Sequence, residues 1–193
     1  MKKVLIGGIG NVLLGDDGVG PYVVRLLTAY YDFEDGVEIV DLGTPALDLI
    51  DQFSGKDAVI LIDCIQSDGA EPGSVMLYRK EDVLRHQPQV RMDPHSPALV
   101  ENLLSAELFG MSPRELLLVG IVGESYAPGC SLSATVNAAV PQAFGEILRE
   151  LDRVGVKYTR REEAIDPQIW WASADLAREK DLHFACENIL PAY

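Results

Sequence analysis

The strongest constraint on the fold is an order that repeats along the chain: an apolar strand, a short loop and then a helix. Residues 3–9 (KVLIGGI) and 36–43 (GVEIVDLG) are predicted strands, and each precedes a segment with helical spacing. Residues 57–65 (DAVILIDCI) form a nearly unbroken apolar run, which is typical of a strand buried on both faces. We therefore expect an α/β fold, a three-layer α/β/α sandwich with a twisted, mostly parallel five-stranded sheet.

The remaining elements extend this pattern. Residues 73–79 follow a connection too short for a crossover helix, so we expect an edge strand that runs antiparallel to its neighbour. A helix is predicted over 96–109 and a last clear strand over 115–123. Inward-facing apolar residues across 136–151 predict a final strong helix, which should end near Gly155.

The length of 193 residues and the 48% hydrophobic content favour one globular domain. We place this domain at residues 1–159 and treat residues 160–193 as a C-terminal tail of unknown role. The tail is mostly polar but contains Trp170 and Trp171. Packing of these rings against the core is favoured over a separate surface for a partner.

Charge and cysteine usage narrow the function classes. The formal net charge is −14, from 30 acidic and 16 basic residues, so the chain should repel nucleic acid. Cys64, Cys130 and Cys186 are widely spaced and predict neither a disulfide framework nor a thiolate zinc site. These features favour a reducing cytoplasm, and we expect a monomer.

The first 15 residues superficially resemble a secretory signal, because two lysines precede an apolar run. Asn11 and several glycines interrupt that run, and Asp16 and Asp17 stand where a small-residue cleavage site is expected. The sequence also lacks an apolar stretch of the roughly 20 residues that span a bilayer. We therefore expect a cytoplasmic protein that does not insert into a membrane.

Two familiar motifs are approached but not matched. Residues 8–20 (GIGNVLLGDDGVG) suggest a dinucleotide fingerprint, yet Leu13 occupies its third glycine position. The adjacent carboxylates would also repel phosphate, so we expect no nucleotide cofactor. Residues 123–127 (GESYA) approach the nucleophile elbow of serine hydrolases, but Ala127 breaks the pattern.

A metal site explains the polar residues better. Asp17 precedes the first helix, Asp63 closes a buried strand and His95 directly precedes a predicted helix. In a doubly wound sheet these places lie along one crevice, and two carboxylates with an imidazole suit a borderline divalent metal. Asp41, at the end of the second strand, is a candidate neighbour of these ligands. The competing interpretation is that these residues cap helices and form turns.

A signalling module is the alternative from another class. A phosphoacceptor receiver domain also carries an acidic pair after its first strand and an aspartate after its third, here Asp16, Asp17 and Asp63. Such a module also needs a lysine at the end of its fifth strand, and residues 116–125 (LLLVGIVGES) contain none.

Several motifs together resemble those of the nickel-iron hydrogenase maturation endopeptidases. These are GIGNVLLGDDGVG, VEIVDLGT, ILIDCI, DPHSP and ELLLVGIVGES, which occur in order over about residues 3–155. The resemblance implies a twisted, largely parallel sheet between helices. It also implies an enzyme that binds the hydrogenase large-subunit precursor after nickel insertion and removes its C-terminal extension.

The resemblance further implies roles for individual residues. The metal-contacting and catalytic positions of the family correspond to Asp17, Asp63 and His95, with the nickel supplied by the substrate. The first of these is often glutamate in relatives, and Leu42 replaces a glycine of the second-strand motif. We expect Cys64 to fill the core rather than to act as a nucleophile, because it alternates onto the other face of the strand from Asp63. Asp16 is expected to cap a helix or to orient a ligand.

Overall fold

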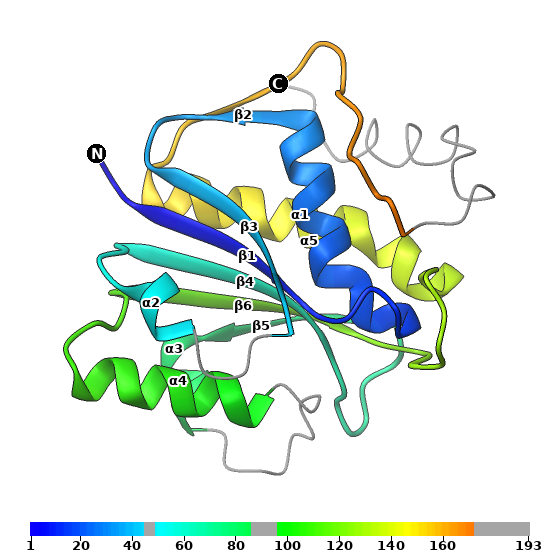
Figure 1. The fold of residues 1–193 in the computed structure, drawn as a ribbon, viewed down its shortest axis with the longest axis horizontal. Helices are drawn as coiled ribbons and strands as arrows, with labels where there is room; N and C mark the ends of the chain where they lie inside the picture. The colour runs from blue at the N-terminus through cyan, green and yellow to red at the C-terminus, as the bar shows by residue number, and fades with distance from the viewer. Residues whose placement is uncertain (45–48, 86–95, 172–193) are drawn as a thin grey trace.

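The computed structural model describes residues 1–44, 49–85 and 96–171. Its central sheet has five strands in the order β3-β1-β4-β6-β5 (Figure 1). The four parallel strands are β1 (Val4–Ile9), β3 (Val37–Gly43), β4 (Ala58–Ile65) and β6 (Glu115–Val122). Strand β5 (Val75–Arg79) lies at one edge and pairs antiparallel with β6, as the short connection before it predicts.

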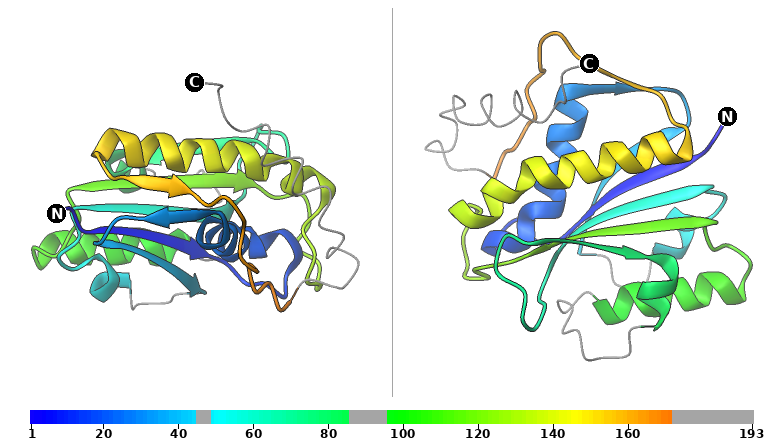
Figure 2. Two further views of the ribbon diagram at one scale, coloured as in Figure 1. Left: turned by 90° about the horizontal axis from the view of Figure 1, so that it is seen from above. Right: turned by 180° about the vertical axis from the view of Figure 1, so that it is seen from behind.

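Helices cover both faces of this sheet (Figure 2). One layer contains α1 (Val19–Tyr30) and α5 (Ala134–Val154), and the other contains α2 (Leu49–Phe53), α3 (Lys80–Arg85) and α4 (Ser96–Leu108). The predicted three-layer α/β/α sandwich with a five-stranded, mostly parallel sheet is therefore confirmed. Within the described ranges, no helix has the length and apolarity that a bilayer crossing requires.

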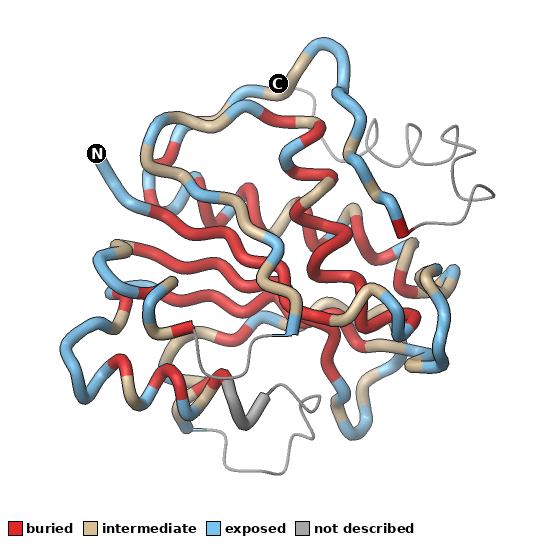
Figure 3. Tube along the Cα trace, in the orientation of Figure 1, coloured by how far each residue is buried: buried red, intermediate tan, exposed pale blue. Residues whose placement is uncertain are grey.

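Strand β4 lies at the centre of the sheet, and all eight of its residues are buried (Figure 3). Ile60, Ile62 and Cys64 belong to the core beneath α1 and α5, whereas Leu61 and Ile65 belong to the core beneath α2 and α4. Each large apolar side chain buried in this way contributes about 1.5–3 kcal/mol. Burial on both faces explains why this segment lacks the alternation of a half-exposed strand.

A second, two-stranded sheet was not predicted. Strand β2 (Tyr31–Phe33) directly follows α1 and pairs antiparallel with β7 (Tyr158–Arg160). Beyond β7, Trp171 is buried within the core beneath α1 and α5, which confirms the expected packing for that ring. Trp170 is 73% exposed and meets Trp171 edge to face, so it does not follow that expectation. Residues 172–193 of the predicted tail lie outside the described ranges.

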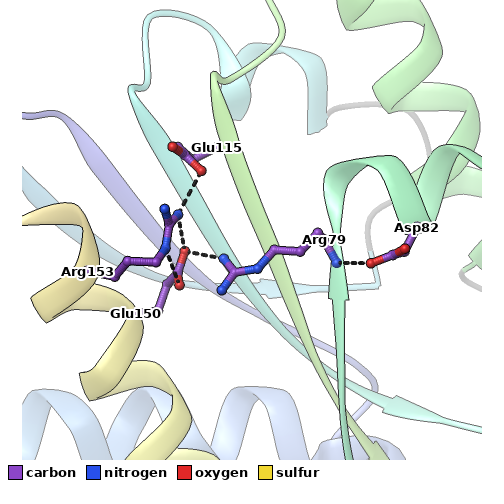
Figure 4. Close-up of polar contacts among 5 residues, drawn as sticks. All are labelled: Arg79, Asp82, Glu115, Glu150 and Arg153. Carbon is purple, nitrogen blue, oxygen red and sulfur yellow. Dashed lines mark hydrogen bonds and ion pairs between the residues drawn. The ribbon is translucent and has the colours of Figure 1, made fainter.

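A cluster of ion pairs fastens α5 to the antiparallel edge strand (Figure 4). The Glu150 carboxylate is only 4% exposed and accepts hydrogen bonds from Arg79 Nη1 at 2.6 Å and from Arg153 Nε at 2.9 Å. Arg153 also binds Glu115 at 2.7 Å, where β6 begins. The cluster therefore joins the two elements at the amino end of β6.

Replacing the buried Glu150 by glutamine should lower the free energy of unfolding by about 1–3 kcal/mol, because the half-exposed guanidinium groups of Arg79 and Arg153 would lose their charged acceptor. Burial raises the pKa of Glu150, but hydrogen bonds from Arg153 and Arg79 outweigh this effect and lower that pKa below its ordinary value of 4.5. The contribution of the carboxylate is thus complete above pH 4.5 and is lost as the pH falls through the lowered pKa.

Urea unfolding of the wild type and of Glu150→Gln, measured between pH 7 and pH 3, checks this prediction. The stability difference should be greatest at neutral pH and should shrink in the acidic range. Equal stability of the two proteins at pH 7 would contradict the role assigned to the cluster.

Candidate functional site

The carboxyl end of β4 carries the first predicted site residue. Asp63 is 1% exposed and pairs in register with Gly120 of β6. Because side chains alternate along a strand, Asp63 lies on the same face as Leu61 and Ile65, toward α2 and α4. A carboxylate thus stands at the centre of the sheet edge where ligands of open α/β proteins bind.

The glycines of the opening motif allow close packing of the backbone. The φ of Gly10 is +138°, and a Cβ there would lie 1.7 Å from the carbonyl oxygen of Asp17. A Cβ at Gly20 would lie 2.2 Å from the carbonyl oxygen of Ile9 and 2.5 Å from that of Ile62. The 3-10 turn η1 (Gly15–Gly18) and the start of α1 therefore rest directly on the ends of β1 and β4.

Asp17 is held in this turn by a local hydrogen bond. Its side chain is 2% exposed, and its Oδ2 accepts the backbone N–H of Asn11 at 2.7 Å. The Asn11 Oδ1 in turn accepts the N–H of Leu13 at 3.0 Å, so the asparagine shapes the loop that enters η1. The close packing of η1 on β4 brings Asp17 to the same sheet edge as Asp63.

Asp16 faces a different partner from its neighbour Asp17. Its Oδ2 accepts the N–H groups of Glu124 at 2.9 Å and Ser125 at 2.8 Å, and its Oδ1 accepts that of Ser133 at 2.6 Å. All three donors lie in the loop between β6 and α5. The carboxylate binds a distant loop and does not cap α1, whereas its expected role in orienting a ligand stays a prediction. This arrangement also occupies the oxygens that the receiver-type alternative needs as open ligands.

Cys64 and Tyr126 pack behind the carboxylates. Cys64 is fully buried, its Sγ donates to Tyr126 Oη at 3.5 Å, and that hydroxyl donates to the carbonyl of Ile65 at 3.1 Å. Burial raises the pKa of the Cys64 thiol, and the charges of Asp63, Asp16 and Asp17 raise it further against the opposing hydrogen bond to Tyr126. A thiol held in its protonated form is a poor nucleophile, which agrees with the core-filling role expected for Cys64.

Two residues of the second-strand motif, Asp41 and Leu42, lie in β3 and make different contacts. Asp41 is exposed, and its Oδ1 accepts the N–H of Gly43 at 3.0 Å. Asp41 thus shapes its own turn in β3, which β1 separates from β4, and its expected place beside the metal ligands stays a prediction. Leu42 occupies the substituted glycine position, and its side chain lies over Gly7. A Cβ added at Gly7 would be 2.4 Å from Leu42 Cδ1.

His95 lies outside the described residues, so its place beside the carboxylates stays a prediction. Helix α4 begins at Ser96, and its first turn points toward the edge where β4 and β6 end (Figure 1). Within the described part of the chain, no three histidine, cysteine or acidic side chains are grouped as a metal ion would require. A complete three-ligand site would therefore need a group from the undescribed segments or from a bound substrate.

The sequence analysis missed the loop at 123–133, which approaches the site through backbone N–H groups. One local signal was available, because Ser133 caps α5 by accepting the N–H of Val136 at 3.2 Å. Tyr126 lies within the GESYA segment, and its hydroxyl contacts the end of β4, a contact that sequence spacing does not reveal.

The fold and its buried carboxylates define an α/β protein whose ligand site lies at the carboxyl edge of its sheet. Comparison with known proteins identifies it further. The model of the HycI family, described as hydrogenase maturation protease, matches residues 21–150. The chain belongs to the hydrogenase maturation proteases, a family of peptidases, and the resemblance in its motifs is confirmed.

Individual relatives agree with this assignment. The hydrogenase 2 maturation protease of Escherichia coli is 34% identical over 167 residues, which cover 85% of this chain and 99% of that protein. The hydrogenase maturating endopeptidase HybD from Escherichia coli is similar in structure, with a TM-score of 0.76 and 33% identity over 82% of this chain and 98% of that chain. The NiFe hydrogenase maturation protease HybD from Thermococcus kodakarensis has a TM-score of 0.63 and 28% identity, covering 77% and 98% of the two chains.

Substitution of Gly20 tests the close packing that positions the turn. Gly20→Ala should lower the free energy of unfolding by at least about 2–3 kcal/mol, because the new methyl group meets two backbone carbonyls. Gly145→Ala in α5 is the matched control, since a Cβ there meets only Arg149 Nη2 at 3.5 Å. That control should be neutral or stabilising by up to about 1 kcal/mol. Equal effects of the two substitutions in denaturant unfolding would argue against the packing role of Gly20.

Proposed function

We propose that this protein removes the C-terminal extension of a nickel-iron hydrogenase large-subunit precursor after nickel insertion. We further propose that nickel already held by the precursor is the signal that permits cleavage. Membership of the hydrogenase maturation protease family supports the peptidase activity. The relative from Escherichia coli, named for hydrogenase 2, supports a hydrogenase precursor as the substrate.

The observation that carries the proposal is the burial of Asp17 and Asp63 at one edge of the sheet. Two acidic side chains at one edge concentrate negative charge where ligands of open α/β sheets bind. This charge would attract a divalent metal carried by the substrate during each encounter. An incomplete ligand set suits such transient capture, because a permanent site would surround the ion with its own ligands.

The third protein ligand in this proposal is His95. In the sequence it directly precedes Ser96, the first residue of α4. The positive end of a helix dipole disfavours the imidazolium form, so a histidine at this position stays neutral and can bind a metal. One imidazole with two carboxylates also matches nickel better than carboxylates alone, which form a harder site.

Peptide hydrolysis at this edge requires a water molecule to add to the scissile carbonyl and the C–N bond to break, with a proton passing to the leaving amine. Nickel held between the precursor and the three residues would polarise the carbonyl or activate the water. Asp17 and Asp63 would fix its position, since one is held by the Asn11 N–H and the other by strand β4. Their burial would strengthen each electrostatic interaction with the ion.

Intact mass measurement of a cognate precursor tests the proposal directly. Incubation with this protein should release a C-terminal peptide from the nickel-loaded precursor and leave the nickel-free precursor unchanged. Cleavage of both forms would retain the peptidase but eliminate nickel as the signal. Failure to cleave either form of a verified cognate precursor would contradict the proposed function.

Substitutions at the site should separate its ligands from its packing residues. Asp17→Asn retains the shape and one acceptor for the Asn11 N–H but removes the charge, and it should reduce processing by about 100-fold. His95→Ala should act similarly. Cys64→Ala is the control, because it alters a neighbouring buried side chain and should process precursor normally. Full activity of Asp17→Asn would show that no charge is needed at that position.

A further inference from the structure

We propose that Asp16 is a positioning residue that fixes the Asp17 turn to the loop between β6 and α5, so that this loop forms a rigid wall of the site. The inference deepens the proposed function and rests on it. It assigns the two adjacent carboxylates different tasks: Asp17 meets the substrate, whereas Asp16 holds the framework around it.

The first step is the completeness of the bonding around Asp16. The side chain is fully buried, and its two oxygens accept N–H groups from Glu124, Ser125 and Ser133 at 2.6–2.9 Å. A carboxylate only accepts hydrogen bonds, so it can serve all three donors at once. An asparagine would offer a single acceptor oxygen and would turn two hydrogens toward N–H groups.

The second step is that the turn at residues 13–16 and the loop at residues 125–129 each donate backbone hydrogen bonds to the other. The N–H of Asp16 donates to the carbonyl of Ser125 at 2.9 Å, and the N–H of Gly15 donates to that of Gly129 at 2.9 Å. Gly129 returns a bond to the carbonyl of Leu13 at 2.9 Å. The turn and the loop therefore behave as one unit, with the Asp16 side chain at its buried centre.

The third step is that the loop is also attached to the strand that carries Asp63. The N–H of Gly123 and the hydroxyl of Tyr126 both donate to the carbonyl of Ile65, at the end of β4, at 3.1 Å. The loop thus bridges the elements that carry the two proposed nickel ligands. Loss of the Asp16 contacts would release one side of this bridge and let the Asp17 turn shift relative to Asp63.

The energetics favour a specific role over simple stabilisation. Burying Asp16 beside Asp17 sets two like charges in a medium of low dielectric, which is unfavourable. The three charge-assisted hydrogen bonds offset this cost, and they also fix the positions of the three N–H donors relative to the carboxylate. A neutral apolar residue would fill the space at lower cost, yet it could not fix the direction of three separate N–H groups.

Asp16→Asn tests the inference in the full-length protein with nickel-loaded precursor. The kcat per folded molecule should fall by about 10- to 100-fold, because small displacements of reacting groups have effects of this size. The KM should change by less than about threefold, because loosening the turn would alter the reacting geometry and not the uniform binding of the precursor. Amide hydrogen exchange at Glu124, Ser125 and Ser133 should accelerate. Glu150→Gln is the matched control, a buried carboxylate at the other end of β6 whose loss should leave kcat unchanged.

A second pair of variants tests the hydrogen bond between the Ser133 N–H and Asp16 without changing Asp16. The φ of Ser133 is −60°, which proline adopts, so Ser133→Pro keeps this φ while it removes the N–H donor and places the ring Cδ against Asp16 Oδ1, which breaks the contact. Ser133→Ala is its control, because both variants lose the hydroxyl cap of α5 and only the proline loses the N–H. Relative to the alanine variant, Ser133→Pro should lower kcat by at least about threefold, because one positioning bond is lost and the ring displaces the Asp16 carboxylate.

The outcomes separate the two levels of the proposal. A fall in kcat with faster loop exchange in Asp16→Asn, and a lower kcat in Ser133→Pro than in Ser133→Ala, support the positioning role. An active wild type with unchanged kcat in Asp16→Asn overturns that role alone, and so does unchanged exchange in the loop. If Asp16→Asn does not fold, equal kcat for the two Ser133 variants overturns it. A wild type that cleaves no verified precursor overturns the proposed function itself.

Discussion

The structure depends on the direct contact of a glycine-rich turn with the ends of two buried strands. At Gly10 and Gly20 the backbone lies closer to Asp17, Ile9 and Ile62 than any Cβ permits. This contact sets the 3-10 turn η1 at the carboxyl edge of the sheet, beside Asp63. The carboxylates gather there because the glycines remove the side chains that would separate turn from sheet.

The two adjacent aspartates of that turn, Asp16 and Asp17, bind different segments of the chain. Residues adjacent in a tight turn project to different sides, so Asp16 reaches back to the loop before α5 while Asp17 is held by Asn11. The loop is thereby tied to the turn, and through Tyr126 to the end of β4. Polar groups that would be costly to bury alone are paired with backbone donors, which is the general condition for burying charge.

The buried acidic residues at the two ends of the sheet have different partners. At the amino end of β6, Glu150 is balanced by Arg79 and Arg153, and this cluster secures the edge strand to α5. At the carboxyl end three aspartates, Asp16, Asp17 and Asp63, are buried. Asp16 and Asp17 accept hydrogen bonds from backbone N–H groups, whereas Glu150 at the other end is paired with guanidinium groups.

The layers, the buried strands, the antiparallel edge strand and the end of the last helix at Gly155 could be predicted from the residues alone, because apolar periodicity and chain connectivity are local properties. The sequence also indicated Asp17 and Asp63 as site residues, through their positions at the ends of predicted elements. The folded structure was needed to show that Asp16 binds residues 108–117 positions away, that Asp41 binds the N–H of Gly43 and that β2 pairs with β7. These features depend on backbone donors and acceptors brought together by folding, and a backbone N–H has no signature in the sequence of side chains.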